Sequence, residues 1–353
     1  MPPASRMTRF TDMAHKPKST AAAVPHEFQR SLRSRLLEDY GILLVVVAMG
    51  AVLAVLQPDY FLSAQNLTNI VRQIGMNALL ALGLYIVIVT AGIDLSVGSV
   101  MAFSIMLLAL SDKAGLPWPL VLLVGPAVGT LIGIVNGLGL TLLRLPHPFI
   151  MTLGTLNAVR GLCNLVTDGR PVSGISSEVR YLGIGDIPLP FGGEFAVIPV
   201  SAILLIVCYA GVAWFMKKVS LGRHIFAIGG NPQAARVSGI NVNGVLVFVY
   251  AASGFFAGLA ALLMAGRTGS GYPNLGIGAE LDAIAAVIIG GASFFGGRGT
   301  VLGVFAGVLV MGLLRNGLNL MNISAFWQQT LIGIIIILAV WVDVLRRSSG
   351  VRT

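Results

Sequence analysis

The chain has 353 residues, of which 56% are hydrophobic and only 10% charged, and its mean hydropathy is +0.88. Soluble domains carry about 25% charged residues, so this composition excludes an ordinary soluble globular protein. Nucleic-acid-binding proteins also carry a net charge such as +9, but here more than half of the 23 basic residues gather in 1–39, 217–243 and 346–353. Basic segments that flank apolar runs indicate membrane topology, so we expect no nucleic-acid partner.

Apolar runs separated by short polar breaks fill most of the chain. A bilayer core needs about 20 mostly apolar residues per helix, and lipid offers backbone groups no hydrogen-bond partner, which favours helices. The predicted spans are 40–57, 74–91, 97–111, 116–143, 149–166, 196–216, 243–266, 283–296, 300–318 and 326–345. The sequence therefore predicts an all-α polytopic integral membrane protein with about ten transmembrane helices.

The basic residues predict how these helices are oriented. With an even number of spans, segments 1–39, 217–243 and 346–353 share one side, and the positive-inside rule makes that side cytoplasmic. Both termini are then cytoplasmic, and the transmembrane domain is 40–345, embedded in the lipid bilayer. The longest loop on the opposite side is 167–195, whose many Gly and Pro residues argue against regular helix.

Two stretches of the chain resemble each other. "GTLIGIVNGLGLTLLRLPHPFIMTLG" begins at Gly129 and "GVLVMGLLRNGLNLMNISAFWQQTLIG" begins at Gly307, and both contain Asn-Gly-Leu, at 136–138 and 316–318. The first runs toward the cytoplasm and the second away from it, which is typical of the inverted repeats of transporters. Chance similarity between apolar segments is the alternative.

Glycines recur every four residues in the fourth span, at Gly125, Gly129, Gly133 and Gly137. Small residues at this spacing let helix backbones approach closely in a membrane. We expect packing inside the chain, with a contact between two copies as the alternative.

The segment "AGIDLSVGS", from Ala91 to Ser99, places an aspartate between two apolar runs. We expect Gly92 to end the second span and Asp94 to cap the N–H groups of residues 96 and 97, with Ser96 and Gly98 completing the break. The alternative is a functional carboxylate, because ionisable residues inside membranes are functional candidates by default.

The loop "KKVSLGRHIFAIGGNPQAARVSGINVNG" contains the signals of a short helix. Asn231 is a favourable N-cap, Pro232 suits the first helical position, and Gly239 suits the position after the end. A helix of about two turns is unstable alone in water, so it needs a docking partner. An ordinary surface turn is the alternative.

Sequence signatures of enzymes are absent. The chain has no Gly-x4-Gly-Lys-Ser/Thr nucleotide motif, no His/Cys cluster with metal spacing and no nucleophile in a recognisable catalytic setting. We therefore expect a protein that is not an enzyme and that binds no metal or cofactor itself.

Three motifs resemble those of a known family. Ala234, Ala235 and Gly239, ahead of a membrane span, resemble the coupling loop of ABC importer permeases. "AGIDLSVGS" and "VIIGGASFFGGRGTVLG", from Val287, resemble hallmark segments of the permeases that import ribose, arabinose, xylose and galactose. Many more distant importers have a glutamate at the position of Gln233 in this motif. Glutamine is neutral, so this position of the coupling loop contributes no charge.

This resemblance implies a permease subunit in the bacterial inner membrane that carries a monosaccharide, with a pentose such as ribose as the first expectation. Its partners would be a second copy, a periplasmic sugar-binding protein and a cytoplasmic ABC ATPase that holds ATP and Mg. The residues expected to contact the ATPase are Asn231, Pro232, Ala234, Ala235, Arg236 and Gly239. The alternatives are an ion-driven secondary transporter and an ABC permease for branched-chain amino acids or nucleosides.

A sugar path needs groups that form hydrogen bonds without strong charge, and aromatic rings that stack on sugar faces. The candidates are Asn136, Asn157, Asn316, Asn319, Phe103 and Phe149. Bonding between neighbouring helices is the alternative role for the asparagines.

Overall fold

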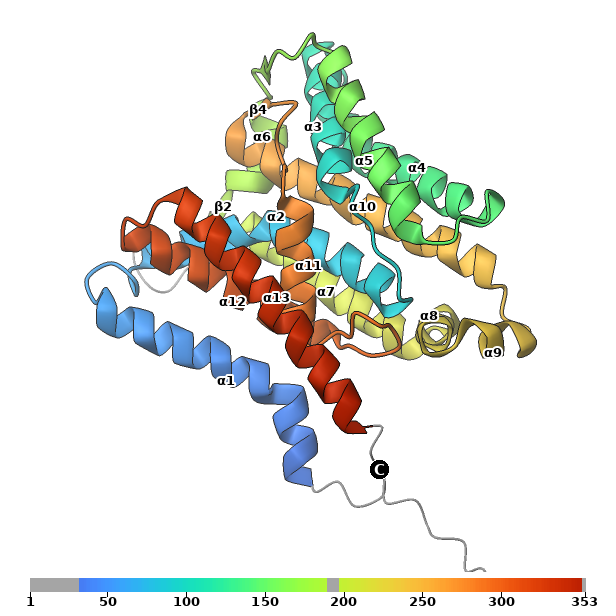
Figure 1. Ribbon diagram of the computed structural model, residues 1–353. Helices are drawn as coiled ribbons and strands as arrows, with labels where there is room; N and C mark the ends of the chain where they lie inside the picture. Colours follow the sequence, from blue (N-terminus) through green and yellow to red (C-terminus); the bar gives the residue numbers. More distant parts are fainter. Residues whose placement is uncertain (1–31, 189–196, 351–353) are drawn as a thin grey trace, which may run out of the picture.

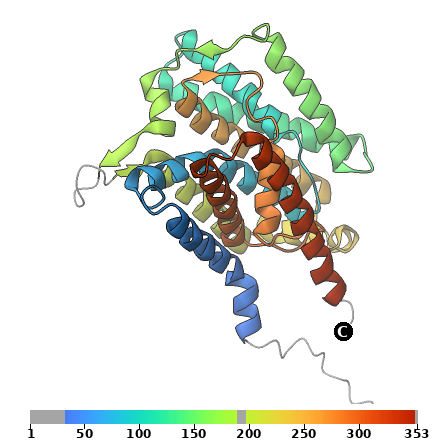
Figure 2. The ribbon, with the colours of Figure 1, turned by 60° about the vertical axis from the view of Figure 1, so that its left-hand side comes forward.

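The computed structural model describes residues 32–188 and 197–350, which form a bundle of helices with a few very short strands (Figures 1 and 2). Most of the predicted basic segment 1–39, and residues 351–353 of the tail, lie outside this described part. The helices are α1 (Leu32–Leu56), α2 (Ala64–Val89), α3 (Val97–Lys113), α4 (Trp118–Leu142), α5 (Pro148–Leu165), α6 (Ser177–Ile184), α7 (Val200–Lys218), α8 (Ser220–Gly230), α9 (Pro232–Val237), α10 (Val242–Thr268), α11 (Ala279–Ile289), α12 (Val301–Leu320) and α13 (Ala325–Gly350). The strands pair antiparallel, β1 (Val172–Ser173) with β4 (Ser270–Gly271) and β2 (Asp186–Pro188) with β3 (Val197–Pro199).

A helix lies at the position of every predicted span, which confirms a helical membrane protein. In the described part of the chain, six helices are long and apolar enough to cross a membrane, namely α2, α4, α7, α10, α12 and α13. Helix α1 adds a shorter apolar stretch, Gly41–Leu56.

Helix α2 begins ten residues before the predicted span. The hydroxyl of Ser63 caps it by accepting a hydrogen bond from the Asn66 N–H at 3.2 Å. Its first turns contain Asn66, Arg72 and other polar residues, so hydropathy alone does not include them in a span. The polar turns are ordered because their side chains bind other helices, as described below.

Helices α2 and α11 end in the same way. After α2, the Ala91 N–H donates to the Ile88 carbonyl and the Gly92 N–H to the Val87 carbonyl, at 2.9 and 3.1 Å. After α11, Gly291 and Ala292 donate to Ile288 and Val287 at 2.9 and 3.2 Å. Both ends are Schellman motifs, whose turn residue adopts a left-handed conformation.

The sequence prediction therefore needs two corrections. Helix α2 ends at Val89, and the residue that turns the chain after it is Ala91, with φ of 61°, and not Gly92 as predicted. The predicted span 283–296 is wrong in its second half, because Gly291, with φ of 87°, turns the chain just after Ile289.

The 167–195 loop contains helix α6, contrary to the expectation from its glycines and prolines. Gly183 explains the difference, because a Cβ atom there would lie 2.5 Å from the Leu263 carbonyl oxygen of α10. This glycine thus serves close packing and does not form a turn. Helix α6 is stable because α10 supports it.

Helix α10 runs through the middle of the bundle, between α2 and the group formed by α3, α4 and α5 (Figures 1 and 2). The α4 glycines face it backbone to backbone: Gly125 faces Gly258, Gly129 faces Gly254, Gly133 faces Tyr250 and Gly137 faces Val247. A Cβ atom on any of the four would overlap the α10 backbone. The predicted packing inside the chain is confirmed.

We predict that Gly129→Ala destabilises the protein, because the added methyl group would overlap the Gly254 carbonyl and push α4 away from α10. Overpacking of this kind costs about 1–3 kcal/mol. Thermal unfolding in detergent measures the effect. Gly154→Ala in α5 is the matched control, because a Cβ atom there meets nothing within 4 Å. Equal unfolding temperatures for the two variants would contradict the close packing.

Candidate functional site

Asp94 lies in the break between α2 and α3, and only 1% of its surface is exposed. Its carboxylate accepts hydrogen bonds from the Ser96 N–H at 3.0 Å and the Ser96 hydroxyl at 2.6 Å. The Ser253 hydroxyl of α10 donates a third, at 2.8 Å. No basic side chain pairs with Asp94 among the residues that the structure describes, so neutral donors alone hold the carboxylate.

These bonds agree in part with the capping prediction. The Ser96 N–H binds Asp94 as expected, whereas the other donors are hydroxyl groups and not the N–H of residue 97. Asp94 thus orders the turn before α3 and also ties it to α10. The second role depends on Ser253, which lies far away in the sequence.

The hydrogen-bond network continues into α4 and α5. The Asn136 amide nitrogen donates to the Ser96 hydroxyl at 2.9 Å, and the Thr155 hydroxyl donates to the Asn136 amide oxygen at 2.6 Å. The amide nitrogen and the amide oxygen of Asn136, one of the path candidates, are therefore both bonded to residues outside α4. We call Asp94, Ser96, Ser253, Asn136 and Thr155 the polar joint.

The two glycines of the break make room for neighbouring residues. A Cβ atom on Gly92 would lie 2.9 Å from the Tyr250 hydroxyl. A Cβ atom on Gly98 would overlap the Glu280 carboxylate and the Gly276 carbonyl oxygen. Both positions therefore serve close contact with the second half of the chain.

The other path candidates lie apart from the polar joint. Asn316 on α12 exchanges two hydrogen bonds with Asn66 on α2, at 2.8 and 3.2 Å. Asn319 is exposed and accepts a bond from Gln328 at 2.8 Å. On the remaining helices, Asn157 and Phe149 are exposed and Phe103 is half-buried. The structure does not bring the six candidates together in one place.

The predicted short helix is present as α9, and its predicted ends are confirmed. The Asn231 side chain accepts hydrogen bonds from the N–H groups of Gln233 and Ala234, both at 3.0 Å. At the other end Gly239 has φ of 83°, and its N–H donates to the Arg236 carbonyl at 3.1 Å. The helix thus satisfies its own terminal groups and needs no neighbour for this.

Helix α9 presents most of its surface to solvent. Ala235 is buried and anchors the helix. Pro232, Gln233, Ala234 and Arg236 are exposed, and Val237 is 90% exposed. A capped helix with one anchored residue and an apolar tip is suited to docking.

Helix α8, which leads into α9, touches the end of α2 directly. A Cβ atom on Gly229 would overlap the Val89 carbonyl oxygen and would lie 2.6 Å from the Gly297 nitrogen. The Gly297 N–H also donates to the Val89 carbonyl at 2.9 Å. The backbones of α8, the end of α2 and the segment around Gly297 therefore meet at Val89. This contact links α8, and with it α9, to the chain just before the break at Asp94.

A cavity of about 310 Å³ lies among α2, α10, α11 and α12, toward the other end of α2. Its charged and amide side chains are Arg72, Gln73, Asn77, Arg267, Asp282 and Arg315. Arg315 forms an ion pair with Asp282. None of the six path candidates lines this cavity.

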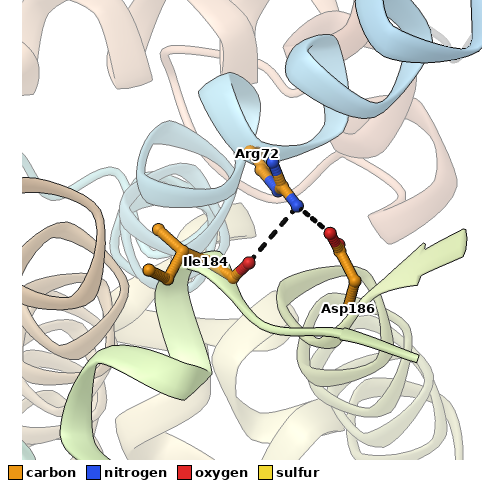
Figure 3. Close-up of polar contacts among 3 residues, drawn as sticks. All are labelled: Arg72, Ile184 and Asp186. Carbon is orange, nitrogen blue, oxygen red and sulfur yellow. Dashed lines mark hydrogen bonds and ion pairs between the residues drawn. The ribbon is translucent and has the colours of Figure 1, made fainter. Parts of the chain in front are cut away.

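Arg72 connects the cavity to the loop segment that carries α6 and β2 (Figure 3). Its guanidinium donates to the Asp186 carboxylate at 2.5 Å and to the Ile184 carbonyl at 3.3 Å. Arg72 and Asp186 lie 114 residues apart in the sequence, so this ion pair ties the loop to α2.

Sequence reasoning missed the cavity residues as a group. Arg72 lay outside the predicted span, and Arg315 was not singled out within its own. The usable signal was the rarity of charged residues inside apolar runs, which marks functional positions. It marks Asp94 and holds equally for Arg315, whereas Asp282 directly precedes the predicted span 283–296.

The described part of the chain is thus a bundle of apolar helices with an exposed, capped helix on one connecting loop, an arrangement suited to a membrane transport subunit. Residues 66–340 match the family described as the permease component of branched-chain amino acid transport systems. The chain belongs to this family.

Three relatives show which permeases the chain is similar to. The chain is 40% identical over 312 residues to the ribose import permease protein RbsC of Haemophilus influenzae, covering 88% of this chain and 94% of that protein. It is 39% identical over 326 residues to the galactose/methyl galactoside import permease protein MglC of Escherichia coli, covering 88% and 95%. It is 35% identical over 366 residues to the xylose transport system permease protein XylH of H. influenzae, covering 88% and 97%. No solved structure matches the chain.

We predict that Asp94→Asn retains a stable fold while Asp94→Ala loses about 1–3 kcal/mol. Asparagine keeps an oxygen for the Ser96 donors, whereas alanine leaves the buried donors without a partner. Thermal unfolding of both variants checks this. Equal losses for both would show that the negative charge, and not the hydrogen bonding, is what the site requires.

A second pair of variants tests the contact between α8 and α2. Gly229→Ala should loosen α8 and expose the 217–243 loop to protease, because its methyl group would overlap the Val89 carbonyl. Gly230→Ala is the matched control, since a Cβ atom there meets nothing within 4 Å. Limited proteolysis of intact vesicles measures the difference, and identical cleavage rates would argue against the contact.

Proposed function

We propose that this chain is the permease subunit of an ATP-driven importer and forms the path of a monosaccharide, with ribose favoured, across the bacterial inner membrane. The observation that carries the proposal is α9, which is capped at both ends, exposed and anchored at Ala235. The printed names of the relatives, which import ribose, galactose and xylose, favour sugars. The family description favours branched-chain amino acids as the second candidate cargo.

The assembly that we propose has two copies of this chain, two cytoplasmic ATPase subunits that hold ATP and Mg, and a periplasmic sugar-binding protein. Both termini and the α8–α9 loop would be cytoplasmic. The basic residues of segments 1–39, 217–243 and 346–353 support this orientation. Helix α6 and strand β2 would then face the binding protein.

We also propose ten transmembrane helices arranged as an inverted repeat. The packing of the two short helices supports this arrangement. Helix α3 packs on α4, α5 and α10, while α11 packs on α12, α13 and α2. The short helices α3 and α11 would be the corresponding members of the two halves.

The six path candidates remain part of the proposal. Asn157, Asn319 and Phe149 have exposed side chains and Phe103 a half-buried one, so these four are available to line a path between two copies. Asn136 and Asn316 bond neighbouring helices. They would contribute by holding these helices in place.

The decisive experiment reconstitutes the permease with its ATPase and binding protein. Gly239→Val should leave the permease inserted but should abolish copurification of the ATPase and sugar-stimulated ATP hydrolysis, because a β-branched residue cannot adopt the left-handed cap without strain. Gly239→Asn is the matched variant that should retain both, since asparagine tolerates this conformation.

Several results would overturn the proposal. Wild-type ATP hydrolysis by Gly239→Val would show that α9 is not the coupling helix. Uptake that needs a proton gradient and not ATP would favour a secondary transporter. Uptake of leucine in place of ribose, xylose and galactose would favour the second cargo.

A further inference from the structure

We propose that the cavity among α2, α10, α11 and α12 binds one monosaccharide inside each subunit. The inference rests on the proposed function and extends it, because it assigns a binding site that none of the six path candidates lines. The cavity of about 310 Å³ lies at the lower end of the range of ligand sites, about 300–1,000 Å³. A small solute therefore fits it best.

The charges of the cavity favour a neutral ligand over an anion. Arg315 is paired with Asp282, and Arg72 is paired with Asp186. Arg267 is exposed, and its side chain makes no hydrogen bond or ion pair with another residue that the structure describes. One unpaired cation at an exposed position is a weak anion site, whereas the paired groups remain available for hydrogen bonds.

The residues around the cavity offer both hydrogen-bond donors and a hydrogen-bond acceptor. The Nε atoms of Arg72 and Arg315, which are donors, and the Oδ1 atom of Asn77, an acceptor, are buried without a partner. Buried polar groups in proteins nearly always have partners, and these three atoms belong to residues that line the cavity. A hydroxyl group both donates and accepts, so a sugar can satisfy all three, whereas phosphate has little to donate to Asn77.

The walls are suited to the rest of a sugar molecule. Ile74, Met264, Val308 and Met311 line the cavity together with the polar groups. Apolar side chains beside a few placed polar groups are the usual composition of a small-molecule site. They would contact the C–H faces of a sugar ring.

The position of the cavity agrees with delivery from outside. Arg72 joins its wall to α6 and β2, the segment proposed to face the binding protein (Figure 3). Helix α8 contacts the opposite end of α2, which leads into the break at Asp94. A sugar released onto the α6 side would reach this cavity before the cytoplasmic half of the subunit.

Protection of a thiol from labelling tests the proposal. Met264→Cys places a thiol in the cavity wall of the reconstituted complex, with Cys163 and Cys208 replaced by serine. Saturating D-ribose, D-xylose or D-galactose should slow labelling by a small thiol reagent about tenfold, and inorganic phosphate should not. Asn164→Cys on α5, exposed and outside the cavity, is the matched control whose labelling should not change.

Each other outcome overturns the inference. Absence of labelling at Met264→Cys would show that solutes do not reach the cavity, and labelling without sugar protection would show that sugars do not bind there. Protection by phosphate would show an anion site. ATP-dependent ribose uptake by the same complex separates these failures from a failure of the proposed function, which would show as no sugar uptake at all.

A second pair of variants tests the role of the amide group. Asn77→Leu keeps the side-chain volume but removes its hydrogen bonds, so sugar protection at Met264→Cys should need about tenfold more sugar. Asn164→Leu should leave the protection curve unchanged. An unchanged curve for Asn77→Leu, in a complex that retains its unfolding temperature, would remove Asn77 from the site.

Discussion

The close contact of α4 with α10 is the constraint on which the rest of the structure depends. Lipid tails are as apolar as leucine, so helices in a membrane associate through close packing and hydrogen bonds and not through the hydrophobic effect. Glycines on both helices bring the two backbones together. With α10 fixed in this way, its Ser253 reaches Asp94, its Leu263 supports α6, and its Arg267 lines the cavity.

Helix α2 runs between two polar regions, and α10 contributes Ser253 to one and Arg267 to the other. At the end of α2, α8 contacts the Val89 carbonyl, and nearer its start Arg72 binds the segment after α6. Because each helix is continuous between these regions, a displacement at α9 would reach the cavity as a rigid-body movement of α2. Such a movement requires no rearrangement within the helix.

The sequence predicted best what depends on local signals. The caps of α9 at Asn231 and Gly239 are set by residues within one short segment, and the glycine spacing of α4 predicts its packing directly. The polar start of α2 and helix α6 escaped prediction because their order comes from distant partners. For the same reason the sequence could not show that Ser253 and Thr155 complete the polar joint, or that Arg72 binds Asp186.

The matching ends of α2 and α11 differ in one residue that affects their stiffness. Ala91 holds a left-handed conformation that costs a non-glycine residue about 1–2 kcal/mol, and few neighbouring conformations are open to it. Gly291 holds the corresponding position without that penalty and has a wide range of backbone angles available. As mechanical elements the two breaks are therefore unequal: the break beside Asp94 is a stiff corner, whereas the break after α11 is a compliant one that can absorb bending.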